Sequence, residues 1–268
     1  MQNSKNVKSS SPENNLFILY ANMDSFLNKR AEFKQRLSDY CQPPDVIAIT
    51  EVKLKKFRYQ IDLCEIQIEG YNMIENNITT NNGRGVVMYV KNEVPMLKKQ
   101  TKSSDNVLIK LKNKQNINIW CIYRSPNSTS NEDDLLQDEI KEISLAAREP
   151  LLIIGDFNYP TIDWVNNKTK SGCSSSKKFL DLVSDCYLEQ LVDKPTRYRK
   201  EHEPTLLDLV LTNHPEMVAN INIEEPVGKS DHAVLGIFLS ISIDDVNTLE
   251  KSFSITKGII ITLVNSLI

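Results

Sequence analysis

Polar side chains that could do chemistry follow a short apolar segment in the middle of this chain. Residues 151–154 are apolar, and Gly155, Asp156, Phe157 and Asn158 come next. A short apolar run closed by a turn signal is typical of a buried strand, and reacting groups in α/β folds collect at the carboxyl ends of such strands. A carboxylate there can accept a proton, and an amide nearby can hold that carboxylate in place. The structural alternative is an ordinary turn that Asp156 and Asn158 cap.

Other apolar segments also end beside polar side chains. These residues are Asn22 after 16–20, Glu51 after 46–50, Tyr123 at the end of 117–123, Asp208 inside 206–211, and Asp231 with His232 before 234–241. An uncompensated buried charge costs several kcal/mol, so this repeated arrangement predicts a bound cation that several carboxylates share. Glu, Asp and Asn oxygens with no cysteine nearby favour a hard ion, Mg²⁺ or Mn²⁺.

Plainer interpretations exist for single members of this set. Tyr123 could be a core tyrosine whose hydroxyl finds a partner, and Asp208 could bond only to the backbone. His202 and His214 lie in polar or proline-flanked loops and are interpreted as surface histidines. Asp156 and His232 together are harder to explain without a function, because two separate motifs would have to coincide by chance.

The elements that would position these residues are strands and helices. Buried strands are expected at 16–20, 46–50, 86–90, 107–112, 117–123, 151–154, 206–211 and 234–241. Amphipathic helices are expected at 29–41 and at 177–186. A third helix is expected to begin at a cap on Ser130 or Asn131 and to end at about Arg148. Residues 81–85 predict a turn, and 113–116 predict the turn of a hairpin. The fold class that we expect is α/β.

Length and composition are those of a globular protein. The chain has 268 residues, of which 40% are hydrophobic and 25% charged. Residues 1–15 are expected to be a disordered lead-in, residues 16–243 the domain, and residues 244–268 an atypical, peripheral tail. We find no signal peptide and no transmembrane segment, since the apolar run 258–264 is far too short to span a bilayer.

Cysteine usage and net charge narrow the function classes. The five cysteines are widely spaced and form no CxxC pair, which argues against a disulfide framework or a cysteine zinc site and favours a reducing compartment. The net charge is −3, so a nucleic-acid partner would need a local basic face.

Several motifs resemble one family in their order and spacing. The motifs Asn22, Thr50-Glu51, Tyr123-Arg124-Ser125-Pro126, Gly155-Asp156-Phe157-Asn158, Asp208 and Ser230-Asp231-His232 resemble the endonuclease/exonuclease/phosphatase superfamily. Pancreatic DNase and apurinic/apyrimidinic endonucleases belong to it. The resemblance covers about Leu16 to Ile241. It implies a four-layer α/β/β/α sandwich of two mixed sheets, as in DNase.

Finer details resemble one branch, the endonuclease domain of non-LTR (LINE-type) retrotransposons. They are Phe157-Asn158-Tyr159-Pro160 with Asp163-Trp164, Pro195-Thr196-Arg197, and the run from Leu207 to Asn213. Residues 244–268 do not resemble the linker that leads to a reverse transcriptase in that branch, so we interpret the chain as an isolated endonuclease-like product or a truncated or decayed copy.

The resemblance implies which residues bind the metal and activate water. Glu51 would be the principal metal ligand, with Asn22 beside it and Asp231 as a further ligand. Asp156 would orient or deprotonate the attacking water, and Asn158 would hold Asp156 or the phosphate.

The resemblance also implies which residues act on the phosphate. His232 would stabilise charge on the phosphoryl oxygens, with Asp231 fixing its ring. Tyr123 would donate to the phosphate, and Asp208 would support the site from a neighbouring strand. Phosphodiester hydrolysis needs this set, because it depends on positioning and on neutralising the charge that develops.

Basic and aromatic residues near these strands are candidates for DNA contacts. The candidates are Arg124, Arg197, Arg199, Lys200, Thr196 and Trp164, and beyond these Lys194, Tyr198 and the run Lys53, Lys55, Lys56 and Arg58 after Glu51. The aromatic rings could stack on an extruded base or wedge a groove. The alternatives are solvated loops for the charges and packing at the rim for the rings.

The function expected first is a Mg²⁺-dependent endonuclease that nicks double-stranded DNA and leaves a 3′-hydroxyl, which in the resembled branch primes reverse transcription. A nuclear or cytoplasmic location follows from that substrate and from the absence of a signal peptide. One alternative is an inositol-phosphate or lipid phosphatase or phosphodiesterase of the same fold. Another is a catalytically dead DNA-binding or dimerisation remnant. Target sequence, cleavage at abasic sites and oligomeric state do not follow from the residues.

Overall fold

Two mixed sheets form the centre of the computed structural model, which describes residues 15–54, 61–80, 83–112 and 115–241. The first sheet has the strand order β13-β14-β1-β2-β4-β3 and the second the order β11-β12-β8-β7-β6-β5. The strands of the first sheet are β1 (Leu16–Asn22), β2 (Val46–Thr50), β3 (Tyr71–Asn76), β4 (Val86–Lys91), β13 (Val218–Glu224) and β14 (Val234–Leu239). Those of the second are β5 (Met96–Lys99), β6 (Asn106–Leu111), β7 (Ile117–Tyr123), β8 (Leu151–Asp156), β11 (Glu189–Gln190) and β12 (Asp208–Thr212).

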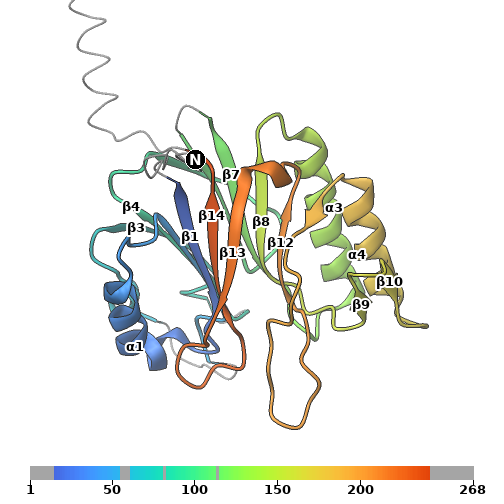
Figure 1. The fold of residues 1–268 in the computed structure, drawn as a ribbon, viewed down its shortest axis with the longest axis horizontal. Helices are drawn as coiled ribbons and strands as arrows, with labels where there is room; N and C mark the ends of the chain where they lie inside the picture. The colour runs from blue at the N-terminus through green and yellow to red at the C-terminus, as the bar shows by residue number, and fades with distance from the viewer. Residues whose placement is uncertain (1–14, 55–60, 81–82, 113–114, 242–268) are drawn as a thin grey trace, which may run out of the picture.

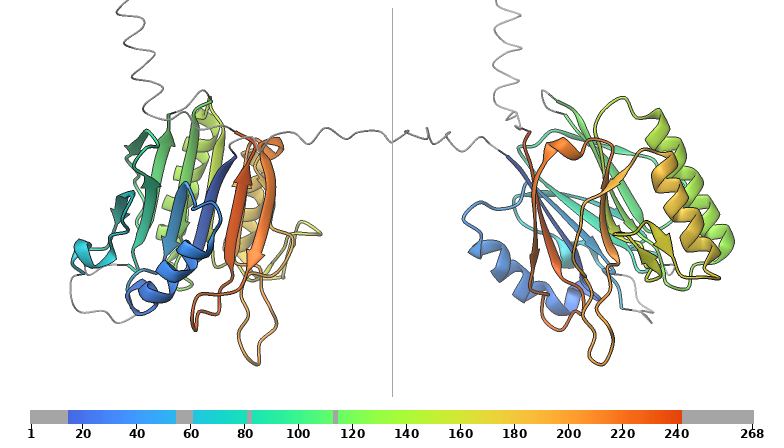
Figure 2. Two further views of the ribbon diagram at one scale, coloured as in Figure 1. Left: turned by 60° about the vertical axis from the view of Figure 1, so that its left-hand side comes forward. Right: turned by 45° about the vertical axis from the view of Figure 1, so that its right-hand side comes forward.

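Helices cover the outer faces of both sheets (Figures 1 and 2). They are α1 (Phe26–Asp39) and α2 (Leu63–Ile66) on the first sheet, and α3 (Ser130–Ala146) and α4 (Ser174–Asp185) on the second. A short 3-10 helix (Pro215–Met217) precedes β13, and a small ribbon of β9 (Ile162–Asp163) and β10 (Lys168–Thr169) lies beside α4. The four-layer α/β/β/α sandwich expected from the sequence is confirmed.

The apolar runs are continuous because both faces of the central strands are buried. In β1, Leu16, Ile18 and Tyr20 face the core between the sheets. Phe17 and Leu19, which alternate with them, join the core under α1. β8 divides in the same way between the inter-sheet core and the core under α3 and α4.

The strands that sequence patterns miss are those at the edges of the sheets. β3 and β13 flank the first sheet, and β5 and β11 flank the second. Each has few fully buried residues, for example none in β13, because an edge strand exposes part of its surface. Their apolar runs are therefore interrupted.

The helix boundaries also shift. α1 begins at Phe26, before the expected start at residue 29. The cap of α3 is Thr129 instead of Ser130 or Asn131, because Thr129 and Glu132 form a reciprocal capping box. The helix expected at 177–186 begins at Ser174.

Some expectations fall outside the described residues. They concern the lead-in 1–14, the turn at 81–82, the hairpin turn at 113–114, the basic residues Lys55, Lys56 and Arg58, and the tail 244–268. Among the described residues, no helix is long and apolar enough to cross a membrane.

Strand direction places the polar strand ends together. β1, β2, β7 and β8 end where β12 and β14 begin, since Asp208 pairs with Asp156 and Val234 with Ala21. The opposite end of the sandwich holds the start of β1, where Leu16 bonds to Ile241 (N···O 3.2 Å). The lower end in Figure 1 therefore carries the candidate residues.

Candidate active site

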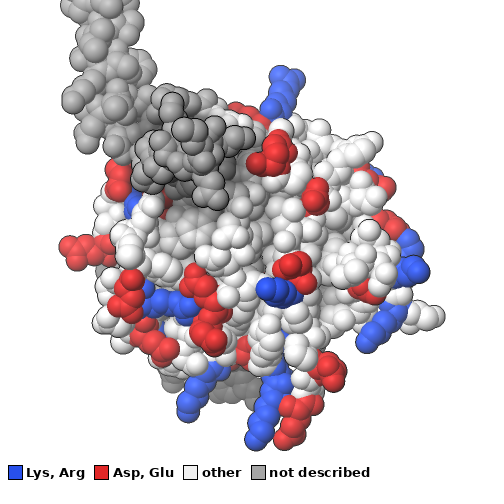
Figure 3. Space-filling view, viewed as in Figure 1, with Lys and Arg blue, Asp and Glu red and all other residues white. Residues whose placement is uncertain are grey.

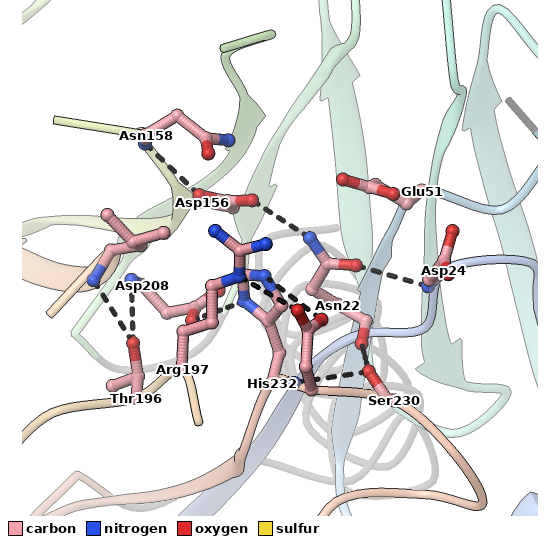
Figure 4. Close-up of polar contacts among 12 residues, drawn as sticks. Asn22, Asp24, Glu51, Asp156, Asn158, Thr196, Arg197, Asp208, Ser230 and His232 are labelled. Carbon is pink, nitrogen blue, oxygen red and sulfur yellow. Dashed lines mark hydrogen bonds and ion pairs between the residues drawn. The ribbon is translucent and has the colours of Figure 1, made fainter. Parts of the chain in front are cut away.

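Asp156 lies fully buried at the end of β8 and is held from both sheets (Figure 4). The side-chain amide of Asn22, on β1, donates to its Oδ2 at 2.9 Å, and the backbone N–H of Asn158 donates to its Oδ1 at 3.1 Å. Burial raises the pKa of Asp156 to about 8, and the nearby carboxylates of Asp208 and Glu51 act in the same direction, while the charge of His232 opposes them. This carboxyl is therefore suited to accept a proton near neutral pH.

Glycine precedes Asp156 because the two parallel strands approach closely there. A Cβ at Gly155 would lie 1.9 Å from the carbonyl oxygen of Ile122 on β7. Its φ of 149° also lies in a region that side chains disfavour. Gly155 thus allows β8 to run beside β7 up to Asp156.

His232 is paired with Asp208. Nδ1 of His232 lies 2.8 Å from Oδ2 of Asp208. The other carboxylate oxygen of Asp208, Oδ1, accepts a hydrogen bond from the hydroxyl of Tyr20 at 2.8 Å. Burial alone would lower the pKa of His232, but the carboxylates of Asp208, Asp156 and Asp231 raise it to about 10. The ring is therefore a cation at neutral pH.

The expectation that Asp231 fixes the ring of His232 was wrong. Its Oδ1 lies 3.9 Å from Nε2 of His232, too far for a hydrogen bond, whereas Asp208 holds the other ring nitrogen. Asp231 instead pairs with Arg197 (Nε···Oδ2 2.9 Å). Partial burial opposes ionisation, but Arg197 and the His232 cation lower the pKa of Asp231.

Asp24 and Glu51, together with Asn22, form a second set of side chains, which we call the oxygen group. Asp24 follows β1, Glu51 follows β2, and Nη2 of Arg84 lies 2.6 Å from a carboxylate oxygen of each. Asn22 is tied to this group because its Oδ1 accepts from the backbone N–H of Asp24 at 3.1 Å. Asp24, Glu51 and Asn158 have positive φ, as do six other non-glycine residues in the described part of the chain.

These residues fit a hard divalent cation. Their donors are oxygens of Asp24, Glu51 and Asn22 with no sulfur among them, and one cationic nitrogen already reaches both carboxylates. A second group, Asp156, Asp208 and His232, also clusters closely enough to hold an ion. There, however, Asn22, Asn158 and Tyr20 already donate to the two carboxylates, and Asp208 pairs with Nδ1 of His232. We therefore take the oxygen group as the candidate metal site.

Tyr123 and Asn158 are the remaining candidate residues of the site. Tyr123 is mostly buried, lines the cleft and bonds to Glu51, and burial raises the pKa of its hydroxyl. The side-chain amide of Asn158 donates to the carbonyl of Arg124 at 2.9 Å, which joins the loop after β8 to the loop after β7.

A cleft of about 770 Å³ opens above these residues. Its lining includes Asn22, Asp24, Glu51, Arg84, Tyr123, Asn158, Ser230, Asp231 and His232, with a basic rim of Arg197, Arg199, Lys200 and Lys229. Basic and acidic side chains mix over the face in Figure 3, and long basic ones project from its lower end. Arg197, Arg199 and Lys200, expected to meet DNA, therefore lie beside the candidate catalytic groups.

Three other residues expected to contact DNA do not line the cleft. Arg124 is buried, bonds to both carboxylate oxygens of Asp133 at 2.7 Å and stacks over the ring of Tyr159. Thr196 is fully buried, and its hydroxyl accepts from the backbone N–H of Asp208 at 3.0 Å. Trp164 packs edge-on against Phe179 of α4, outside the cleft. We correct the assignments of Arg124 and Thr196, because internal contacts hold these buried side chains away from the cleft. The contact of Trp164 with DNA stays a prediction, since its side chain is partly exposed.

Sequence reasoning missed Asp24, Arg84 and Tyr20. Asp24 had a usable signal, because it follows Asn22 by two residues as Asn158 follows Asp156. Tyr20 lies inside an apolar run and looked like core. Arg84 lies next to glycines before β4 and carried no signal of its own.

Comparisons with known proteins agree with this geometry. Residues 117–235 match the model of a family described as endonuclease-reverse transcriptase. Curated protein sequences give no match. The endonuclease domain of TRAS1, a telomere-specific non-LTR retrotransposon, superimposes with a TM-score of 0.61 at 13% identity, covering 84% of this chain and 98% of that one. The fold is that of the endonuclease/exonuclease/phosphatase superfamily.

Two further solved structures share the superfamily fold. The AP endonuclease LMAP from Leishmania major has a TM-score of 0.67 at 10% identity and covers 89% of this chain and 92% of its own. The 3′-5′ exonuclease NExo from Neisseria meningitidis has a TM-score of 0.58 at 17% identity and covers 84% and 100%. The superfamily resemblance expected from the sequence is thus confirmed, and identities this low carry the fold and not a substrate.

Proposed function

We propose that this chain is a divalent-metal-dependent DNA endonuclease that cuts one strand of a duplex and leaves a 3′-hydroxyl. The observation that carries the proposal is the convergence of Asp156, the His232–Asp208 pair and the oxygen group around Glu51 on one cleft with a basic rim. This set combines a proton acceptor, a fixed cation and a metal site within one cleft, which phosphodiester hydrolysis needs.

Asp156 is the group that activates water in this proposal. In its ionised form it accepts a proton from the attacking water. Asn22 and Asn158 fix both of its oxygens, so that the carboxylate does not rotate. Its neighbours Asn158 and His232 line the cleft, and in this proposal the scissile phosphate binds next to them.

His232 supplies a fixed positive charge. Because Asp208 holds Nδ1, the ring presents its other edge toward Asp231 and the cleft. A cation in a partly dehydrated site stabilises the charge that develops on phosphoryl oxygens. Tyr123, which lines the same cleft, would donate to the phosphate.

Glu51, Asp24 and Asn22 would hold the metal ion, with Asp231 as a further ligand. Mg²⁺ or Mn²⁺ bound there would neutralise charge on the phosphate and on the leaving oxygen. Asn22 belongs to both groups, since its oxygen faces Asp24 and its amide nitrogen bonds to Asp156. It therefore couples the placement of the proton acceptor to that of the metal ligands.

Duplex DNA is the proposed substrate because the cleft has a basic rim although the whole chain is acidic. Arg199 and Lys200 are exposed beside the cleft, and Tyr198 as a residue is 49% exposed. Phosphate contacts of this kind position a backbone without reading its sequence. A 3′-hydroxyl at the nick would serve as a primer for reverse transcription, and such a substrate places the protein in the nucleus.

The test uses a duplex oligonucleotide labelled at the 5′ end of one strand. We expect Mg²⁺-dependent internal cuts whose labelled products a DNA polymerase extends directly, which shows a 3′-hydroxyl. Cuts whose products are extended only after phosphatase treatment would contradict the proposed chemistry. Release of phosphate from inositol phosphates without DNA cleavage would favour the phosphatase alternative, and DNA binding without any turnover would favour the dead remnant.

A further inference from the structure

Arg84 occupies an unusual place for an arginine, between two candidate metal ligands. Its Nη2 lies 2.6 Å from Oδ1 of Asp24 and 2.6 Å from Oε2 of Glu51, and only 14% of its side chain is exposed. Its Nε donates to the backbone carbonyl of Lys53 at 2.8 Å. The guanidinium is thus held at several points and not merely resting on an acidic surface.

The loop that carries Arg84 is built to aim it. The buried carboxylate of Asp105, in the loop before β6, accepts from the backbone N–H groups of Arg84 at 3.2 Å and Gly85 at 3.0 Å. A Cβ at Gly83 would collide with that carboxylate, at 2.1 Å from Oδ2. The backbone N–H of Lys53 donates to the carbonyl of Arg84 at 2.8 Å. These contacts fix the backbone on both sides of the arginine.

We propose that Arg84 is a positioning residue that acts as a built-in counter-ion of the metal site. It holds Asp24 and Glu51 together before the metal arrives, and it weakens metal binding because the ion must take the same carboxylates from it. The inference rests on the metal requirement of the proposed function. Arg84 adds to the site a group of the protein itself that competes with the metal ion for the two carboxylates.

Electrostatics sets the direction of the effect. Two carboxylates without Arg84 would repel each other and would attract a divalent cation more strongly. Losing Arg84 should therefore tighten metal binding and, at the same time, destabilise the protein without metal. A residue with a merely structural role would lower stability equally with and without metal, and a residue that helps to bind the metal would weaken binding when removed.

The experiment measures Mn²⁺ binding calorimetrically, without DNA, for the wild type, Arg84→Gln and Arg36→Gln. Arg36 is the matched control, because it also pairs with a carboxylate, Glu224 at 2.9 Å, and lies outside the cleft. We expect Arg84→Gln to bind Mn²⁺ at least about tenfold more tightly and Arg36→Gln to match the wild type. Thermal unfolding in EDTA and in Mn²⁺ should show a larger metal-induced rise in Tm for Arg84→Gln.

Equal or weaker Mn²⁺ binding by Arg84→Gln would overturn the inference and leave the proposed function standing. Failure of every variant and of the wild type to bind Mn²⁺ would overturn both. If Arg84→Gln does not fold, Arg84→Met is the second variant. It removes the charge and keeps an unbranched side chain that can pack in the same place, so its Mn²⁺ affinity should lie above that of the wild type. An unchanged or lower affinity would again overturn the inference.

Discussion

The ring of His232 is held by Asp208, whose Oδ2 lies 2.8 Å from its Nδ1, and not by the adjacent Asp231. The two partners come from β12 and from the loop before β14, and thus from the two different sheets. Tyr20 of β1 donates to the same carboxylate at 2.8 Å. The charge of the histidine therefore depends on a contact that forms only when the two sheets pack together.

Replacing Asp208 by Asn should lower activity and change its pH dependence. The rate should rise with pH as Asp156 ionises, with its pKa of about 8, and fall as His232 loses its proton near its pKa of about 10. Asp208→Asn removes a negative charge that raises the pKa of both His232 and Asp156, so the alkaline fall and the acid rise should both move to lower pH. We expect nicking at neutral pH to drop by about a hundredfold or more.

Single-turnover nicking rates from about pH 6 to about pH 11 would measure this effect. Tyr20→Phe is the control, because it removes the other hydrogen bond to Asp208 and leaves the His232 pair in place. An alkaline limb that stays where it is in Asp208→Asn would contradict the role given to the pair.

The buried pair of Arg124 and Asp133 should stabilise the fold in a pH-dependent way. Burial opposes ionisation of Asp133, but hydrogen bonds from Arg124 and Ser175 lower its pKa. A lowered pKa in the folded state adds stability above the unfolded value of about 4, and that stability is lost as pH falls through the folded value.

Asp133→Asn should therefore lower the free energy of unfolding by about 3 kcal/mol at pH 7, because it leaves the Arg124 charge buried and unpaired. The difference in unfolding free energy between the variant and the wild type should become smaller below a pH of about 4. Urea unfolding at neutral and acidic pH would measure both values. An equal gap at the two pH values would show that Asp133 acts through packing and not through its charge.

The basic rim should contribute to DNA affinity and not to the chemical step. Arg199→Ala and Lys200→Ala should each weaken duplex binding by about threefold to tenfold and reduce the slope of log affinity against log salt by about one. Lys178→Ala is the matched control, since Lys178 lies on α4 and pairs with Asp134 at 3.0 Å. Fluorescence anisotropy at several salt concentrations would measure the slopes. Slopes equal to that of the control would remove the rim from the DNA interface.

The sequence was informative where a strand is buried on both faces. Continuous apolar runs marked β1, β2, β7 and β8, and their direction made Asn22, Glu51, Tyr123 and Asp156 neighbours. Pairings between distant segments were not available from the pattern. The Asp208–His232 contact and the placement of Arg84 depend on how the sheets and loops pack.

The motifs also did not show whether a residue within them is exposed to DNA or buried in the fold. Arg124 follows Tyr123 directly and was taken for a DNA contact, yet its guanidinium turns inward to Asp133 on α3. Thr196 was grouped with its basic neighbour Arg197, although its hydroxyl accepts from the backbone at the start of β12. Side-chain direction in loops depends on tertiary contacts, and these leave no periodic signal in the sequence.

The most direct test of the central claim is conversion of supercoiled plasmid to open circles by the purified chain, with Mg²⁺ or with EDTA, beside Asp156→Asn. The variant keeps the shape of the side chain and removes its ability to accept a proton. We predict open circles only for the wild type and only with metal, with the variant at least about a hundredfold slower. Equal conversion by both proteins, or conversion in EDTA, would contradict the assignment of this site as a metal-dependent nuclease centre.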